Sequence, residues 1–309
     1  MKQPQTPTCP PNADGVTLSL DELLYYKQQT VHWLPPAKSL WSQMLGQHQS
    51  RQLGRGMDFA EVRQYQPGDD IRSIDWRVTA RTGKTHTKLF SEEREKPVVL
   101  YIDLSSSMIF GSTLMLKSVL AAHMASLISW LSVAQKDRIG AVIDTGTQLV
   151  ELKPTSRNKG PLVLIQQLIT LHNQLLQHPA SERVDSMTNA FQALNRLCPK
   201  GSEVIMISDF VRMSQQHHPL LTQLRQHNRV RFVHISDPLE QGKTRYRGVE
   251  QVSDKKNTQW LDFASRKTRQ RIERAFDSKQ QQLKSSAQSL GITFTSLSSD
   301  QSLLQQLSG

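Results

Sequence analysis

Cysteine is scarce in this 309-residue chain, and the two thiols, Cys9 and Cys198, lie far apart and form no CxxC motif. Their number argues against a disulfide framework and against a cysteine-bound zinc ion. No run of about 18 consecutive apolar residues occurs, as a standard transmembrane helix would need. Residues 1–15 also lack the apolar core of a secretory signal. We therefore expect a cytoplasmic protein without a membrane span.

Acidic residues are outnumbered, with 27 Asp and Glu against 38 Lys and Arg, which gives a net charge of +11. This balance suits nucleic acid, an anionic membrane or an acidic protein as partner, or simply a solvated basic surface. The arginines gather within residues 51–81 and 266–274. No zinc finger or aromatic-interleaved RNA motif accompanies them, so nucleic acid is not the expected partner. A nucleic-acid-binding protein that uses this basic surface stays open as an alternative.

Three segments differ in composition. Residues 1–17 are rich in Pro and Thr and are expected to form a disordered tail. Residues 18–96 are expected to contain a helix at 18–34 and then an arginine-rich region of hairpins and turns. Residues 97–309 alternate apolar runs with amphipathic stretches. With 37% hydrophobic residues and a mean hydropathy of −0.48, the chain is expected to be soluble and to bury a sizeable core.

The last segment predicts an α/β fold. Apolar, β-branched runs predict strands at 97–103, 137–144, 147–153, 203–208, 229–236 and 292–297. Helical spacing predicts helices at 112–134, 161–176, 188–197, 215–227 and 262–289. Such alternation is typical of a doubly wound, mostly parallel sheet with helices on both faces. In these sheets the functional crevice lies outside the carboxyl ends of the strands.

The usual enzyme motifs are absent from the sequence. Two segments resemble a phosphate-binding loop, but 111–118 lacks the second glycine and 78–85 lacks the first. No GxSxG nucleophile elbow is present either. Asp103 lacks the second aspartate that a phospho-acceptor site would carry two positions on, because Ser105 stands there. We therefore expect a protein that is not an enzyme, and a Mg²⁺-dependent phosphotransfer enzyme built on Asp103 stays open as a further alternative.

One constellation of oxygen-bearing side chains lies at predicted strand ends. Asp103, Ser105 and Ser107 form D-x-S-x-S directly after the predicted strand 97–103. Asp209 ends another apolar strand, and Thr188 opens a predicted helix. Hydroxyl and carboxylate oxygens suit Mg²⁺ or Mn²⁺. Taken singly, each residue could equally be a helix cap or a turn residue.

The order D-x-S-x-S, Thr, Asp resembles the metal-ion-dependent adhesion site of von Willebrand factor A domains. That resemblance implies a doubly wound sheet of the von Willebrand A and Rossmann-like kind. It also implies a divalent cation, Mg²⁺ or Mn²⁺, bound directly or through water, with one position left for a partner's carboxylate. The implied ligands are Asp103, Ser105, Ser107, Thr188 and Asp209.

A longer resemblance covers residues 45–307. The stretch GRGMDFAEVRQYQPGDDIRSIDWRVTARTGK (54–84), the stretch EREKPVVLYIDLSSSMIFGS, and the later pieces KDRIGAVI, ISDF and ISDPLE are similar to the bacterial domain-of-unknown-function family 58. Members of that family are commonly encoded beside MoxR-type AAA+ ATPases, which implies adaptor or chaperone work with such an ATPase. Small glycines often precede the family's threonine, whereas Ser186 and Met187 precede Thr188 here.

The arginine-rich segment 54–84 allows two interpretations. Its acidic residues interleave with its arginines, and Trp76 lies among them. We favour an internally paired layer of hairpins, pinned by Trp76 and packed on the sheet. The alternative is an arginine-rich docking face for an acidic partner. The charged residues concerned are Asp69, Asp70, Asp75, Arg63, Arg72, Arg77 and Arg81.

Overall fold

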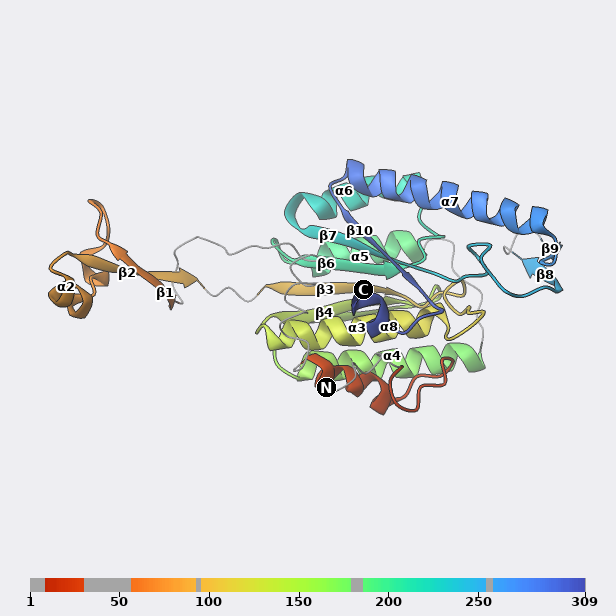
Figure 1. Ribbon diagram of the computed structural model, residues 1–309, viewed down its shortest axis with the longest axis horizontal. Helices are drawn as coiled ribbons and strands as arrows, with labels where there is room; N and C mark the ends of the chain where they lie inside the picture. Colours follow the sequence, from red (N-terminus) through yellow and green to blue (C-terminus); the bar gives the residue numbers. More distant parts are fainter. Residues whose placement is uncertain (1–8, 31–56, 93–95, 179–185, 254–257, 309) are drawn as a thin grey trace, which may run out of the picture. The chain divides into compact units, whose positions relative to one another are not determined.

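The computed structural model describes residues 9–30, 57–92, 96–178, 186–253 and 258–308 (Figure 1). The chain divides into two compact units. Unit 1 contains residues 1–40 and 96–309, and unit 2 contains residues 41–95. The expected N-terminal helix therefore belongs with the α/β part of the chain rather than with the arginine-rich segment.

A six-stranded sheet forms the centre of unit 1. Its strands are β3 (Pro97–Asp103), β4 (Arg138–Asp144), β5 (Leu149–Thr155), β6 (Glu203–Ser208), β7 (Arg229–Ser236) and β10 (Thr293–Ser298). Their order in the sheet is β10-β7-β6-β3-β4-β5. β5 pairs antiparallel with β4, and every other pair is parallel. The prediction of a mixed α/β fold with a mostly parallel sheet is confirmed.

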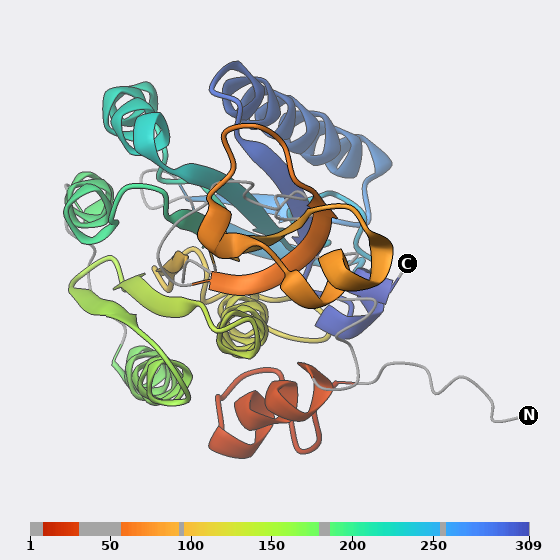
Figure 2. The same cartoon turned by 90° about the vertical axis from the view of Figure 1, so that its left-hand side faces the viewer.

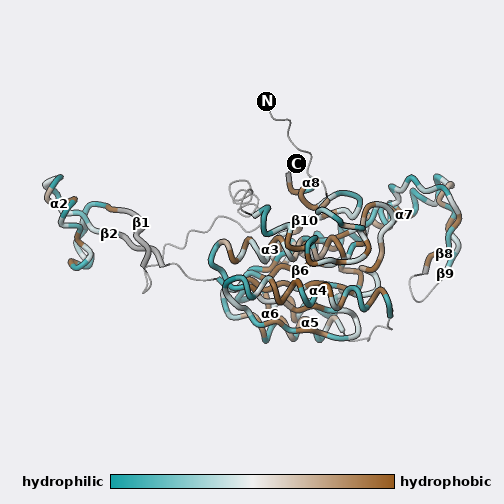
Figure 3. The backbone as a smooth tube through the Cα atoms, turned by 90° about the horizontal axis from the view of Figure 1, so that it is seen from below, coloured by the Kyte–Doolittle hydropathy of each residue, from teal (hydrophilic) through white to brown (hydrophobic). Residues whose placement is uncertain are grey.

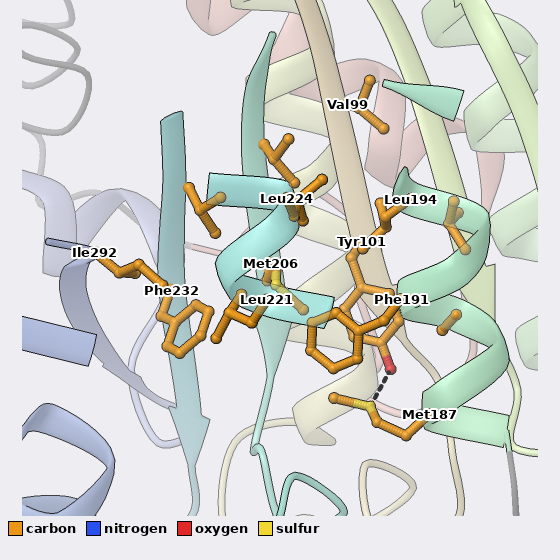
Figure 4. Packing of buried hydrophobic residues seen from close by; sticks show 14 of the residues in the cluster. Val99, Tyr101, Met187, Phe191, Leu194, Met206, Leu221, Leu224, Phe232 and Ile292 are labelled. Atoms are coloured by element: carbon orange, nitrogen blue, oxygen red, sulfur yellow. Dashed lines mark hydrogen bonds between the residues drawn. The ribbon is translucent and has the colours of Figure 1, made fainter. Parts of the chain in front are cut away.

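Helices cover both faces of this sheet (Figure 2). They are α3 (Lys117–Ala134), α4 (Lys159–Gln177), α5 (Ser186–Leu197), α6 (His218–His227), α7 (Arg266–Ser289) and α8 (Leu303–Ser308), with a 3₁₀ turn at Gln215–His217. Side chains of β3 alternate between the faces. Val99 and Tyr101 join the core beneath α5 and α6 (Figure 4), whereas Leu100 and Ile102 point to the opposite face. Both faces of β3 are therefore buried in the protein.

α3 is the most deeply buried helix. By length and composition alone it could cross a membrane, but 89% of it is buried inside the protein, as in the core helix of an α/β sheet. Figure 3 shows the hydrophobic residues concentrated in such central elements. α3 begins five residues later than the predicted start at 112. The loop before it turns so tightly that a Cβ on Gly111 would lie 2.3 Å from the carbonyl oxygen of Met115.

The N-terminal segment packs on α3. Residues 20–30 are helical, in agreement with the prediction for 18–34 as far as the described residues reach. Glu22 Oε1 lies 2.6 Å from His123 Nε2, and both side chains are buried. Residues 9–17, expected within a disordered tail, form turns, and the Gly15 carbonyl accepts from the Leu116 amide at 2.8 Å. This docking explains why they are ordered.

Unit 2 is built on an antiparallel pair, β1 (Met57–Gln64) and β2 (His86–Glu92), as the expected hairpins require. Between the strands lie η1 (Ile71–Ser73) and the short helix α2 (Trp76–Thr82), which the sequence patterns did not predict. Asp75 caps α2 by accepting from the amides of Arg77 and Val78, and Gly83 ends it at a φ of 70°. Trp76 is 67% exposed, so its ring is not buried within unit 2, and the expected packing of this layer on the sheet stays a prediction.

A second small hairpin was also missed by the sequence patterns. β8 (Val249–Ser253) and β9 (Thr258–Asp262) pair antiparallel outside the main sheet. They precede α7, which therefore starts at Arg266 rather than at 262. Trp260 of this hairpin is 68% exposed.

Candidate functional site

Four of the five predicted metal ligands lie together at the carboxyl edge of the sheet. Asp103 is the last residue of β3, and Asp209 directly follows β6, the neighbouring strand. Ser105 and Ser107 lie in the loop after β3, and their hydroxyl oxygens are 3.3 Å apart. The hydroxyl of Ser208, at the end of β6, donates to Asp103 Oδ2 at 2.7 Å. The loop after β3 and the end of β6 therefore form one polar cluster.

Thr188, the fifth predicted ligand, is not linked to this cluster by a hydrogen bond among the described residues. α5 begins at Ser186, so Thr188 is the third residue of the helix rather than its first, and it is half-buried. Within the described ranges, no hydrogen bond joins its hydroxyl to the other four predicted ligands. Ser186, two positions earlier, instead donates to Asp144 Oδ1 at 2.6 Å. The hydroxyl of α5 that reaches a buried carboxylate is therefore that of Ser186 rather than that of Thr188.

The Asp103 carboxylate is buried and well provided with donors. Oδ1 accepts from the Ser105 amide at 2.9 Å and from Arg212 Nη2 at 2.7 Å, and Oδ2 accepts from Ser208 Oγ at 2.7 Å. Burial nevertheless raises the pKa of Asp103 above its ordinary value, although the charge of Arg212 opposes this. Charged Asp103 therefore depends on the guanidinium beside it.

Arg212 connects two strand ends. Its Nη2 lies 2.7 Å from Asp103 Oδ1 and 2.8 Å from Asp144 Oδ2, at the end of β4. Asp144 also accepts from the Tyr101 hydroxyl at 3.0 Å, and this hydroxyl contacts the sulfur of Met187 (Figure 4). The neighbouring carboxylates raise the pKa of Arg212 despite its burial. A fixed positive charge thus lies between two buried carboxylates.

Lys117 gives Asp209 a similar partner. The fully buried Nζ of Lys117 lies 2.9 Å from Asp209 Oδ2 and 2.6 Å from Glu240 Oε1. Burial acts to raise the pKa of Asp209, but the charge and hydrogen bond of Lys117 outweigh it and the pKa is lowered. Asp209 is therefore a stable carboxylate, whereas burial raises the pKa of Glu240.

The donor set fits a divalent cation in charge and in chemistry. Among the described residues, Asp103, Asp144, Asp209 and Glu240 pair with two basic side chains, Arg212 and Lys117, so the carboxylates outnumber their cations by two. Hydroxyl and carboxylate oxygens are the hard ligands that Mg²⁺ and Mn²⁺ prefer. Within the part of the chain that the structure describes, no three His, Cys, Asp or Glu side chains converge as in a carboxylate-rich metal centre. The serine hydroxyls would therefore be essential ligands.

Sequence reasoning missed four members of this cluster: Lys117, Asp144, Arg212 and Glu240. Asp144 had a usable signal, because it ends an apolar strand just as Asp103 and Asp209 do, and it pairs in register with Asp103. Lys117 and Arg212 had no such signal. Their long side chains reach carboxylates 92 and 109 residues away in the sequence.

Solved structures offer only distant similarity. The BatB protein of Bacteroides thetaiotaomicron is 13% identical at a TM-score of 0.38, over 66% of this chain and 90% of that one. An aerotolerance-related membrane protein of Bacteroides fragilis is 14% identical at a TM-score of 0.39, over 66% of this chain and 93% of that one. TM-scores this low carry no argument about function.

Curated relatives are closer in sequence. An uncharacterized protein of Mycobacterium tuberculosis is 31% identical over 193 residues, which are 62% of this chain and 59% of the relative. The uncharacterized protein YeaD of Bacillus subtilis is 44% identical over 48 residues, 16% of this chain and 12% of the relative. The chain thus matches about three-fifths of the length of the mycobacterial relative. Residues 61–282, well over half of the chain, match the family described as protein of unknown function DUF58, and the chain belongs to that family.

Proposed function

We propose that this chain is a non-enzymatic protein-interaction module that binds a partner's Asp or Glu through a divalent cation. The observation that carries the proposal is the pair of hydroxyls, Ser105 and Ser107, 3.3 Å apart beside the carboxylates of Asp103 and Asp209. This arrangement, together with the order of the residues in the chain, supports a von Willebrand A-like site. Ser105 and Ser107, with Asp103 and Asp209, would hold Mg²⁺ or Mn²⁺ directly or through water.

The partner follows from the charge that the site would acquire. A divalent cation balances the two excess carboxylate charges and can still accept a carboxylate oxygen from outside. An acidic side chain on a client or on a MoxR-type AAA+ ATPase has that chemistry. The resemblance to family 58 supports the ATPase, and the two free cysteines suit a reducing cytoplasm. Thr188 remains a proposed ligand of lower rank, since the α5 hydroxyl that bonds a buried carboxylate is that of Ser186, on Asp144.

Titration with Mn²⁺ tests the metal. We expect Ser107→Ala to weaken Mn²⁺ binding at least tenfold, because it removes one oxygen ligand and keeps the size of the side chain close to that of serine. Ser106→Ala is the matched control, because Ser106 is an exposed neighbour in the same loop. Isothermal titration calorimetry on the full chain measures both. Equal affinities for the two variants would refute the metal site.

Binding to an AAA+ ATPase of the MoxR type from the same organism tests the partner. We expect association in Mg²⁺ that EDTA abolishes and that Ser107→Ala weakens, measured by biolayer interferometry. Association of equal strength in Mg²⁺ and in EDTA would retain the ATPase as partner and reject the metal-mediated contact.

A further inference from the structure

The acidic side chains of unit 2 are used within the unit. Asp69 bonds the Gln66 amide at 2.8 Å and Arg63 Nη2 at 2.7 Å. Asp70 caps η1 through the Arg72 amide at 2.9 Å. Asp75 caps α2 and lies 3.5 Å from Lys88 Nζ. The interleaved charges of the sequence are therefore not a continuous set of ion pairs, because the aspartates serve turns and caps.

The basic side chains are left on the surface. Arg72, Arg77, Arg81 and Lys84 are exposed, and none of them forms an ion pair with a residue in the described ranges. Arg77 and Arg81 are four residues apart on α2 and share one helical face. Like charges at this spacing repel each other, so their proximity is a cost to the helix that an anionic partner would relieve.

Two large apolar side chains are exposed in the same stretch of the sequence as these basic groups. Trp76, at the start of α2, is 67% exposed, and Ile71 of η1 is 65% exposed. We call the set of Ile71, Arg72, Trp76, Arg77, Arg81 and Lys84 the α2 face. Trp and Arg are the side chains most enriched among residues that dominate protein–protein binding energy. An exposed tryptophan flanked by arginines with no described ion-pair partner is thus a surface suited to a second protein.

We propose that the α2 face docks an acidic segment of a partner protein, with carboxylates against Arg77 and Arg81 and an apolar side chain against Trp76. Complementary charge identifies the partner's sign, and the exposed ring requires an apolar contact. Single-stranded nucleic acid usually stacks successive bases on several aromatic rings, and within residues 62–88, where the structure describes side-chain exposure, Trp76 is the one large exposed ring. An interfacial membrane helix needs a wide apolar face, whereas α2 is largely hydrophilic (Figure 3).

This surface belongs to unit 2, whereas the carboxyl edge of the sheet belongs to unit 1, and the proposed contact needs no metal. The test uses the full chain and a fluorescein-labelled peptide of Glu interspersed with Leu, followed by anisotropy at near-physiological salt. We expect Arg77→Glu/Arg81→Glu to weaken binding at least tenfold and Trp76→Ala several-fold, with no effect of EDTA. Arg77→Gln/Arg81→Gln should also weaken it, which separates loss of attraction from disruption of the helix by new charge.

Matched controls distinguish binding at the α2 face from a general effect of the protein's positive charge. Arg271→Glu/Arg274→Glu changes the net charge equally on the exposed face of α7, and Trp260→Ala removes a ring that is 68% exposed. Both should leave the affinity within about twofold. Equal losses in the two arginine pairs would overturn the proposal. So would tighter binding of an oligo-dT strand, or of phosphatidylglycerol vesicles, that depends on Trp76.

Discussion

Arg212 forms ion pairs with two buried carboxylates, those of Asp103 and Asp144, which lie far from it in the sequence. Its side chain is 14% exposed and those of Asp103 and Asp144 are at most 1% exposed, so removing it leaves two carboxylates without their cation. A buried charge without a partner costs far more than the net value of the ion pair. Arg212 is therefore expected to stabilise the fold, and it is also a neighbour of the proposed metal site.

We expect Arg212→Met to lower the free energy of unfolding by about 3–5 kcal/mol at neutral pH. The deficit should shrink as the pH falls, because protonation of Asp103, whose pKa burial already raises, removes one unpaired charge. Urea denaturation at several pH values measures this.

Arg196→Met is the control for that experiment, since the ion pair of Arg196 with Glu151 lies largely in solvent. Its removal should cost no more than about 1 kcal/mol. Comparable losses for the two variants would show that Asp103 and Asp144 do not depend on Arg212.

His234 should produce a distinct pH dependence. Burial among the rings of Phe210, Phe276 and Phe294 lowers its pKa to about 4. The unfolded chain binds a proton at this position near pH 6.5, whereas the folded chain does not until about pH 4. Its contribution to stability is therefore complete above pH 6.5 and is lost as the pH falls to 4, by about 1.4 kcal/mol per pH unit.

His234→Gln should flatten the dependence of unfolding free energy on pH between 4 and 6.5 by about one proton. The slope is the readout, so any loss of stability at pH 7 does not affect the conclusion. The exposed His178→Gln is the control. An unchanged slope in His234→Gln would mean that the folded and the unfolded chain bind a proton at His234 over the same pH range.

At the scale of secondary-structure elements, the described part of the chain shows which strands the hydrophobic pattern of the sequence can predict. β3, β6 and β7 match their predicted bounds because each is a short, almost wholly buried run that is rich in apolar, β-branched residues. Asp103 and Asp209 were then found from the strand ends alone. The hydrophobic pattern thus predicted both the sheet and the two site residues, Asp103 and Asp209, that lie at strand ends.

Elements that bury little were not predictable in this way. α2 has no apolar periodicity, and its limits come from the Asp75 cap and from Gly83 in the left-handed region. The β8–β9 hairpin exposes Trp260, so its sequence lacks the clean alternation of a half-buried strand. The same limit applies to Lys117 and Arg212, whose contacts depend on side-chain reach across the fold rather than on local pattern.

The cap of α2 allows a direct test. We expect Asp75→Ala to speed amide exchange across residues 76–83 by about fivefold, because two helix N–H groups lose their acceptor. Asp75→Asn keeps a capping oxygen and loses only the charge opposite Lys88, so it should exchange nearly as the parent does. Equal exchange in Asp75→Ala and Asp75→Asn would show that the charge, rather than the cap, maintains the helix.

At the scale of the whole molecule, unit 1 is built from two separate stretches of the sequence and unit 2 from one. Residues 1–40 fold with residues 96–309, so unit 2 lies in the sequence between two parts of unit 1. Leu23 is fully buried in the N-terminal helix, and the Ser126 hydroxyl of α3 donates to its carbonyl at 2.7 Å. The N-terminal helix is thus part of the core of unit 1.

Leu23→Ala should therefore destabilise unit 1 as a whole, by about 2–5 kcal/mol, because it opens a cavity against α3. Leu20→Ala is the control in the same helix, where the side chain is 48% exposed and the expected change is within about 0.5 kcal/mol. Thermal unfolding followed by near-ultraviolet circular dichroism measures both. A local loss of helix at unchanged melting temperature would contradict the assignment of residues 20–30 to the core.

The pairing of Glu22 with His123 has a consequence for synthesis. The two residues are 101 positions apart, and unit 2 is translated between them. At ribosomal rates of 5–20 residues per second, Glu22 waits about 5–20 s before its partner is made. During that interval the nascent N-terminal helix exposes Leu23 and Tyr26, the apolar side chains that α3 later covers. These two side chains are therefore the part of the N-terminal helix that a nascent-chain chaperone would shield until α3 is made.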